Sequence, residues 1–275
     1  MCRWLAYSGG PIRLRSLLFD PKDNLIDQSL SSRSAETPTN GDGFGLGWYG
    51  NLKQPGLFRS IRPAWNDSNF RDLADHIESP LFMSHVRATS LATVQETNCH
   101  PFRYKQWLFV HNGEIFEIEK FRKELLMSVS QEYFNNIQGT TDSEVMFHLA
   151  LTFGLENDPP KAVARMAGFI EKMARKYDVA ESLWMTLGIT DGKTLYGFRY
   201  ASDGAAPTLY HSPSVKEIYL LNPAIEGSFG PSAWAIVSEP VGLFKEHWRE
   251  IPQSSMVTVR GGEIKSNNFR PDESE

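Results

Sequence analysis

The sequence predicts a layered α+β domain with a large share of antiparallel sheet. Three observations lead to this prediction. Helical spacing occupies the middle of the chain, short strands with hairpin turns follow it, and no repeat or long linker interrupts the pattern. A chain of 275 residues and 31.1 kDa can also bury a large core. We therefore expect residues 1–275 to form one domain.

The first half of the chain predicts strands, loops and short helices. Met1 to Ser8 is typical of a buried strand that ends in a turn at Gly9-Gly10-Pro11, and Pro11 to Phe19 of a short helix. Residues 43–49 alternate small and large side chains, which suits a strand whose glycines admit close backbone approach. The other expected elements are a loop at 29–40, a helix from Asp67 or Ser68 to Ile77, and strands at 81–87 and 107–111.

The second half predicts helices and then strands. Helical spacing covers residues 115–127, 143–153 and 159–177. Residues 183–190 and 194–200 flank a turn at Asp191-Gly192 and predict a hairpin. Further strands are expected at 208–211, 218–221, 233–238 and 256–260, then a hairpin at Gly261-Gly262 and a frayed polar tail over 267–275.

The composition excludes several classes of protein. It is 41% hydrophobic and 22% charged, with a mean hydropathy of -0.36, as in ordinary soluble proteins. A net charge of -5 gives no basic surface for nucleic acid. No apolar run approaches the roughly 18 residues of a membrane helix. Because Arg3, Arg13 and Arg15 interrupt any signal-peptide pattern, we expect a cytoplasmic protein.

Cys2 is the most informative residue, because it directly follows the initiator methionine. A small second side chain generally permits removal of that methionine, which leaves an α-amine and a thiol on one residue. The amine titrates at about 7.7–8.0 and the thiol at about 8.5. The amine is therefore a suitable base for its own thiol. A disulfide between Cys2 and Cys99 is an alternative, although two cysteines in so long a chain are more typical of a reduced protein.

Arg87 stands where a predicted strand passes into a loop of small residues. Its planar fork suits a carboxylate, although a surface salt bridge is the commoner role of a single arginine. Residues 40–45 (NGDGFG) predict a loop before a glycine-rich strand. They lack the lysine and the following helix of a phosphate-binding loop.

Asn112-Gly113 follows a predicted strand. A strand that breaks at Asn-Gly can present a side-chain amide and a backbone N–H to one point, as an oxyanion hole does. A tight turn is the structural alternative. A zinc site is conceivable from four residues of this region: His85, Cys99, His100 and His111. Their spacing matches no structural zinc pattern, so we expect no metal.

Residues 141–144 (TDSE) predict a helix start. Thr141 and Glu144 fit a capping box, and Asp142 falls in the first turn, where negative charge is favoured. A carboxylate held ionised at that position is also suited to bind an ammonium group.

In this order, Cys2, Asp42-Gly43, Arg87, Asn112-Gly113 and residues 141–144 resemble the class II glutamine amidotransferases of the N-terminal-nucleophile superfamily. Residues 1–7 (MCRWLAY) and 40–49 are similar to a stand-alone bacterial subgroup. That subgroup also includes the ergothioneine-pathway γ-glutamyl hydrolase and the amidotransferase-like subunit of a glutathione-degrading complex. The motifs cover residues 2–144. The resemblance implies a four-layer αββα sandwich of two antiparallel sheets.

The resemblance also implies a role at each matching position. Cys2 would be the nucleophile, and Asn112 and the Gly113 amide would form the oxyanion hole. Arg87 would bind the α-carboxylate of the substrate, and Asp142 would bind its α-ammonium. His100 would be a histidine of the pocket. Two segments depart from the family. Residues 40–43 (NGDG) replace the usual Arg-Gly-Xaa-Asp, and the loop after Arg87 lacks the Trp/Tyr-Ala-Thr-His run, so Thr89 receives no role.

The expected activity is cleavage of a γ-glutamyl amide through a thioester on Cys2, without a cofactor, releasing glutamate and ammonia or an amine. Three alternatives remain open. The protein could supply ammonia to a synthase subunit, or act alone on a larger γ-glutamyl compound. It could also be a catalytically idle subunit that only binds such a compound.

Overall fold

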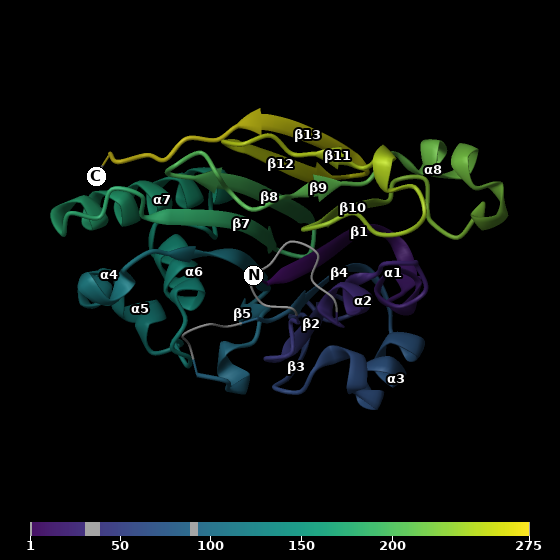
Figure 1. The fold of residues 1–275 in the computed structure, drawn as a ribbon, viewed down its shortest axis with the longest axis horizontal. Coiled ribbons are helices and arrows are strands. Elements are labelled where there is room, and N and C mark those ends of the chain that lie inside the picture. Colours follow the sequence, from purple (N-terminus) through teal and green to yellow (C-terminus); the bar gives the residue numbers. More distant parts are fainter. Residues whose placement is uncertain (1, 31–38, 89–92, 275) are drawn as a thin grey trace.

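A computed structural model describes residues 2–30, 39–88 and 93–274 of the chain. Over these residues the strands form two antiparallel sheets (Figure 1). Sheet A has the order β11-β9-β10-β1-β4-β2-β3, and sheet B the order β13-β12-β8-β7-β6-β5. The strands of sheet A are β1 (Arg3–Arg13), β2 (Phe44–Trp48), β3 (Gly56–Ser60), β4 (Glu78–Val86), β9 (Tyr210–His211), β10 (Trp234–Val237) and β11 (Arg249–Glu250). Those of sheet B are β5 (Phe102–Tyr104), β6 (Trp107–Ile115), β7 (Leu183–Thr190), β8 (Thr194–Ala201), β12 (Ser255–Arg260) and β13 (Glu263–Asn268).

Helices cover the outer faces of the two sheets, and the two groups lie on opposite sides of Figure 1. The helices of the sheet A side are α1 (Arg15–Leu18), α2 (Leu25–Leu30) and α3 (Ser68–His76), with α8 (Val215–Leu221) at the end of the molecule. Those of the sheet B side are α4 (Arg122–Met127), α5 (Gln131–Phe134), α6 (Asp142–Thr152) and α7 (Pro159–Lys176). The predicted αββα sandwich is confirmed. None of the described helices is long and apolar enough to cross a membrane.

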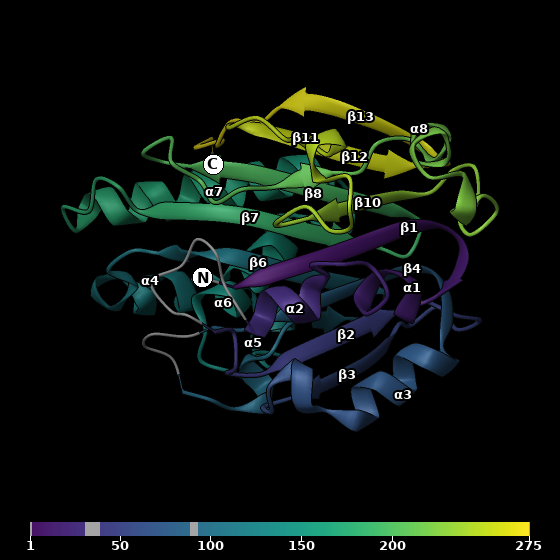
Figure 2. The same cartoon turned by 45° about the vertical axis from the view of Figure 1, so that its right-hand side comes forward.

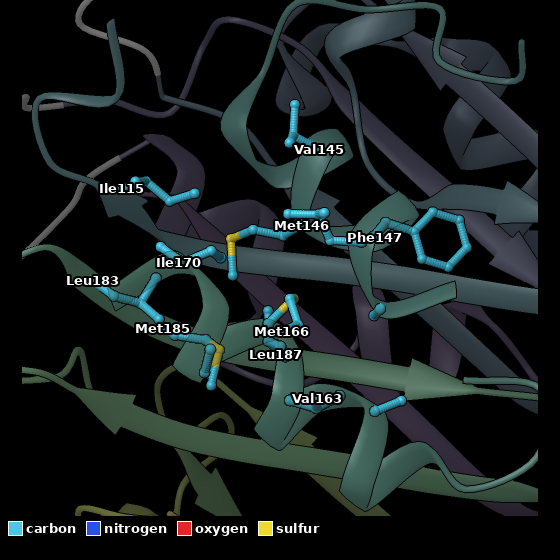
Figure 3. Packing of buried hydrophobic residues seen from close by; sticks show 14 of the residues in the cluster. Ile115, Val145, Met146, Phe147, Val163, Met166, Ile170, Leu183, Met185 and Leu187 are labelled. Carbon is cyan, nitrogen blue, oxygen red and sulfur yellow. The ribbon is translucent and has the colours of Figure 1, made fainter. Parts of the chain in front are cut away.

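Three apolar layers hold the sandwich together. Leu5 and Tyr7 of β1 join the core under α1–α3, whereas Trp4 and Ala6 of the same strand join the layer between the sheets. This alternation follows from the pleat, which sends successive side chains to opposite faces. The third layer lies between sheet B and α6–α7, where Met166 of α7 packs near Met185 and Leu187 of β7 (Figure 3).

Strand β1 is longer than predicted. The segment Gly9-Gly10-Pro11 does not end it, because pairing with β4 resumes at Ile12 after a register shift. A Cβ on Gly9 would lie 2.8 Å from the Cα of Ala233, so this glycine admits a close backbone approach rather than a turn. The helix predicted over 11–19 is correspondingly reduced to α1.

The segment 218–221, predicted as a strand, lies in helix α8. The reason is a capping box that the sequence carries: the Ser214 hydroxyl accepts from the Glu217 amide at 3.3 Å, and the Glu217 carboxylate accepts from the Ser214 amide at 2.7 Å. Helix α2 occupies the start of the loop expected over 29–40, of which residues 31–38 lie outside the described chain.

Two predicted boundaries move because of tertiary pairing. Residues 115–127 begin with the end of β6 rather than with a helix, and α4 starts only at Arg122. The tail expected to fray from residue 267 is held in place. Phe269 is buried, and the Asp272 amide donates to the Ala164 carbonyl of α7 at 2.8 Å. The other long helices, the capping of α3 by Asp67 and the hairpin at Asp191-Gly192 agree with the predictions.

Candidate active site

Cys2 stands at the entrance to β1, where neighbouring residues hold its backbone. The Arg3 guanidinium donates to the Cys2 carbonyl at 2.9 Å and to Glu239 at 2.6 Å. The backbone of Trp4 exchanges two hydrogen bonds of 3.0 Å with Ser238, just beyond β10. The start of the strand is therefore fixed inside sheet A, and Figure 2 shows it next to β6 and β7.

The Cys2 thiol is half-buried and lies 3.4 Å from the carbonyl of Ala88. Both Cys2 and Cys99 are free thiols, so the alternative of a disulfide is wrong. Burial raises the pKa of the Cys2 thiol, while the positive charges of Arg87 and Arg3 act in the opposite direction. Because burial dominates, the thiol is protonated near neutral pH, and its use as a nucleophile requires a base.

Trp4, two residues after Cys2, directs its side chain into the layer between the sheets. The indole of Trp4 donates to the hydroxyl of Thr186 on β7 at 3.3 Å, and this hydroxyl donates to the Asn112 carbonyl on β6 at 3.1 Å. These two hydrogen bonds connect the start of β1 directly to the Asn112-Gly113 segment. Two of the predicted site segments therefore meet across the space between the sheets.

Asn112 and Gly113 lie inside β6, which corrects the expectation that the strand breaks there. Asn112 pairs with Thr186 and Gly113 with Met185. Gly113 has φ of 154°, and a Cβ at this position would lie 2.0 Å from the Trp184 carbonyl. The segment is thus an irregular stretch of strand that only glycine allows, not a tight turn. Asn112 is buried, and its Oδ1 has no hydrogen-bond partner among the described residues.

Asp142 meets the same strand from the start of α6. Strand β5 pairs with β6 over Trp107–Phe109, and further along β6 the Ile115 amide donates to Asp142 Oδ2 at 2.9 Å. The other oxygen, Oδ1, accepts from the Ser143 amide at 2.7 Å and lies 3.2 Å from the Ser143 hydroxyl. The sheet edge beside Asn112-Gly113 is therefore closed by a carboxylate.

The predicted capping box of α6 is half correct. The Thr141 hydroxyl accepts from the Glu144 amide at 3.1 Å, as expected. The Glu144 carboxylate, however, accepts from the amides of Gln138 and Gly139 instead of that of Thr141. The Glu144 carboxylate therefore stabilises the loop before α6, and the Asp142 carboxylate contacts β6.

His111 links these parts, a role that the sequence did not reveal. Its Nδ1 lies 2.8 Å from the Ser143 hydroxyl and its Nε2 lies 3.2 Å from the Trp184 carbonyl. Burial lowers the pKa of His111, while the charge of Asp142 acts against this. Residues 111 and 143 are far apart in the chain, so only their adjacency to Asn112 and Asp142 could have drawn attention to them.

Arg87 follows β4 and is 3% exposed, so the alternative of a surface salt bridge is wrong. Its guanidinium reaches the carbonyls of Asp42 and Thr93, each at 3.4 Å. No carboxylate of the described residues forms an ion pair with it. Over the described ranges this buried guanidinium has only long contacts to neutral acceptors, which is costly, and an anion beside it would offset that cost.

His100 packs against the rings of His85 and Phe102. Its ring stacks on His85 with centroids 4.2 Å apart, and in the part of the chain that the structure describes neither ring nitrogen has a hydrogen-bond partner. His85 Nε2 in turn lies 3.1 Å from the His111 carbonyl. Burial lowers the pKa of His85 to about 3 and that of His100 well below its usual value, so both rings are neutral.

The four residues considered for zinc do not form a metal site. Cys99 is buried, and its thiol points to the carbonyls of Ser60 and Gln95 at 3.5 and 3.7 Å. Within the described ranges, no group of three His, Cys, Asp or Glu side chains is placed to hold a metal ion. Thr89 lies outside the described residues.

The chain belongs to the class II glutamine amidotransferases. The sequence model of the family "Glutamine amidotransferases class-II" matches residues 22–275. A probable glutamine amidotransferase of Saccharomyces cerevisiae, DUG3, is 34% identical over 94% of this chain and 82% of its own length. A γ-glutamyl-hercynylcysteine sulfoxide hydrolase of Mycolicibacterium smegmatis is 29% identical over 71% of this chain and 81% of that protein. The family predicted from the sequence is confirmed.

Solved structures support the same assignment. A glutamine aminotransferase class-II domain protein from Silicibacter pomeroyi has a TM-score of 0.74 and 32% identity, over 98% of this chain and all of that one. The glutamine phosphoribosylpyrophosphate amidotransferase of B. subtilis has a TM-score of 0.66 at 13% identity, over 98% of this chain and 50% of that one. The second likeness shows a shared fold alone.

Proposed function

We propose that this protein hydrolyses γ-glutamyl amides through a thioester on Cys2. The observation that carries the proposal is Arg87, a buried guanidinium whose positive charge acts on the Cys2 thiol and which pairs with no described carboxylate. A substrate carboxylate would supply the missing anion. We further propose that residues 1–275 act as a single amidotransferase domain.

Arg87 and Asp142 fix the amino-acid end of the substrate in this proposal. The guanidinium binds the α-carboxylate, and the Asp142 carboxylate binds the α-ammonium. The substrate side chain then extends toward Cys2 and Asn112 in this proposal. Two hydrogen bonds that connect the start of β1 with Asn112 through Thr186 support it. His100, neutral and buried, forms part of the pocket wall.

The proposed reaction begins after Met1 has been removed. The α-amine of Cys2 takes the thiol proton, and the thiolate attacks the γ-carbonyl carbon. The Asn112 side-chain amide and the Gly113 N–H stabilise the tetrahedral oxyanion. The ammonium of Cys2 protonates the leaving nitrogen, the carbon–nitrogen bond breaks, and ammonia or an amine departs. Water, which loses a proton to the same α-amine, then cleaves the thioester and releases glutamate and the free thiol.

The leaving group distinguishes glutamine from larger γ-glutamyl compounds. The two relatives are named for different substrates, one as a probable glutamine amidotransferase and one as a γ-glutamyl hydrolase. Arg87 and Asp142 recognise only the part that such substrates share. We propose a γ-glutamyl amide as the substrate class, and an ammonia-accepting partner subunit stays a prediction.

The test is an assay of glutamate release from glutamine, glutathione and other γ-glutamyl amides. We expect turnover by the wild type and none above background by Cys2→Ser, because a serine hydroxyl is a far weaker nucleophile at neutral pH. A folded wild-type protein that binds these compounds without releasing glutamate would be the idle binding subunit. Full activity of Cys2→Ser would move the chemistry to another residue.

A further inference from the structure

Arg3 is a buried charged residue directly after the proposed nucleophile, and its side chain is 5% exposed. Leu5, two positions further along β1, packs in the core under α1–α3, so the pleat directs Arg3 to this outer face as well. Trp4, which leads through Thr186 to Asn112, points to the opposite face. Arg3 is therefore turned away from Asn112 and can act on the site only through the backbone of Cys2.

The guanidinium of Arg3 joins Cys2 to Glu239. Its Nη1 donates to the Cys2 carbonyl at 2.9 Å. Its Nε donates to Glu239 Oε1 at 2.6 Å, and Nη2 pairs with the same oxygen. Because a guanidinium is planar and rigid, a carboxylate that holds two of its nitrogens also fixes the direction of the third. Glu239 thus aims the donor that holds the Cys2 carbonyl.

The segment that carries Glu239 is itself anchored on both sides. Ser238 exchanges two backbone-directed hydrogen bonds of 3.0 Å with Trp4, next to Arg3 in β1. On the other side, the Gln28 side chain of α2 donates to the Pro240 carbonyl at 3.3 Å. The carboxylate therefore starts from a backbone that is tied both to β1 and to the helix layer.

Stability alone does not explain a charged pair at this place. Removing a guanidinium and a carboxylate from water is costly, and apolar side chains of similar volume often stabilise a fold equally well. Leu5 shows that the same face of β1 accepts such a side chain. A buried polar network whose members are all bonded fixes one geometry instead. What the Arg3–Glu239 pair fixes is the carbonyl of the proposed nucleophile.

This carbonyl determines where the reacting groups of Cys2 lie. The ladder of β1 begins at Arg3, so Cys2 stands just outside it. After removal of Met1, one peptide bond joins Cys2 to the chain. That peptide unit is planar and contains the Cys2 carbonyl and Cα, and the Cα carries both the α-amine and the thiol. A donor that holds the carbonyl therefore orients both groups.

We infer that Arg3 and Glu239 are positioning residues, which hold the Cys2 carbonyl so that the α-amine and the thiol face the γ-carbonyl of the substrate. This inference rests on the proposed function. Neither residue forms or breaks a covalent bond in the reaction. Since the proposed substrate contacts of Arg87 and Asp142 are untouched, loss of the pair should lower kcat and leave KM nearly unchanged.

The experiment measures steady-state cleavage of γ-glutamyl-p-nitroanilide by Arg3→Gln, Arg3→Lys and Glu239→Gln. For Arg3→Gln and Glu239→Gln we expect kcat to fall about tenfold, with KM within about twofold of the wild type, as for a reacting group that is slightly misplaced. Arg3→Lys keeps the charge and donors to the carbonyl and should retain part of kcat. Intact mass spectrometry and thermal unfolding first confirm that each variant lacks Met1 and is folded.

A second buried pair supplies the matched control. The Arg199 guanidinium is also buried, and it donates to the Glu250 carboxylate and to the Ile251 carbonyl, each at 2.6 Å. It thus makes the same kind of contacts as Arg3, but to Ile251 instead of Cys2. Arg199→Gln and Glu250→Gln should destabilise the protein and leave kcat within about twofold of the wild type.

The rate at which iodoacetamide alkylates Cys2 separates positioning from a simple charge effect and needs no turnover. If charge alone mattered, Glu239→Gln would remove a negative charge near the thiol, favour the thiolate and speed alkylation. A misplaced α-ammonium stabilises the thiolate less, so we expect alkylation to slow by about threefold or more.

Three results would overturn the inference and leave the hydrolase intact: kcat within about twofold of the wild type in both Arg3→Gln and Glu239→Gln, equal losses of kcat in Arg199→Gln, or unchanged or faster alkylation in Glu239→Gln. If the folded wild type cleaved no γ-glutamyl amide, the proposed function would fail instead. The alkylation rates would then still decide whether Arg3 and Glu239 position Cys2.

Discussion

The imidazole of His111 and the hydroxyl of Ser143 lie 2.8 Å apart and join strand β6 to the start of helix α6. This contact stands between the two groups that the proposal assigns to the reaction centre and to the substrate ammonium, Asn112 and Asp142. The Ser143 hydroxyl also lies 3.2 Å from Asp142 Oδ1. The buried Ser143 hydroxyl therefore adds to the bond from the Ile115 amide in fixing the carboxylate relative to the strand.

Ser143→Ala should disturb both stability and substrate binding. The buried His111 ring loses its Nδ1 partner, which costs about 1–3 kcal/mol of the free energy of unfolding. We expect KM to rise several-fold and kcat to change less, measured by urea denaturation and steady-state kinetics. Ser29→Ala is the control, because the buried Ser29 hydroxyl bonds to the Ile26 carbonyl on the far side of sheet A. If Ser29→Ala changes KM equally, His111 and Ser143 have no positioning role.

Arg87→Lys tests the carboxylate partner. Lysine keeps the positive charge but cannot form the two parallel hydrogen bonds of a guanidinium, so KM for a γ-glutamyl amide should rise about tenfold or more. Arg103→Lys serves as control, since Arg103 bonds to the Pro55 carbonyl near the surface. An unchanged KM in a folded Arg87→Lys protein would contradict the assignment.

Asn112→Asp tests the oxyanion hole. Aspartate has nearly the same shape but brings a negative charge to the place where the oxyanion develops. We expect kcat to fall about 10²-fold or more, with little change in KM, because this interaction is strongest in the transition state. Steady-state kinetics measure both values. A kcat within about threefold of the wild type, far less than the usual loss for such a donor, would remove Asn112 from the catalytic residues.

The buried histidines predict how stability depends on pH. A histidine whose folded-state pKa is depressed stabilises the fold above its unfolded pKa, and that stabilisation is lost as the pH falls. For His85 the loss begins near the usual value of 6.5 and continues to about pH 3. Urea denaturation between pH 7 and pH 4 should show a steeper loss for the wild type than for His85→Gln, whose amide can still donate to the His111 carbonyl. Equal slopes would show that His85 is not held neutral.

Local patterns in the sequence were sufficient for much of the fold. Asp67 and Thr141 predicted helix starts, and Asp191-Gly192 predicted a hairpin, because caps and turns depend on neighbours in the chain. The errors arose where pairing between distant strands decides the structure. Gly9-Gly10-Pro11 has turn residues but stays in β1, since β4 resumes pairing beyond it.

The same limit applies to the site. Residue type and order were enough to predict Cys2, Arg87, Asn112 and Asp142 as site residues, and their roles stay predictions. Hydrogen bonds connect the start of β1 with Asn112 and connect β6 with Asp142. The burial of Arg87 and the position of Asn112-Gly113 inside a strand depend on both sheets and could not be read from either segment. The contact between His111 and Ser143 joins positions 32 residues apart, and no local pattern encodes it.

The most direct test of the central claim is intact and peptide mass spectrometry of protein that is acid-quenched during turnover of a γ-glutamyl amide. We predict that Met1 is absent and that a γ-glutamyl group is attached to Cys2. Cys99 should stay unmodified, because burial raises the pKa of its thiol to about 11. An active protein that retains Met1, or that carries the γ-glutamyl group on another residue, would contradict the account.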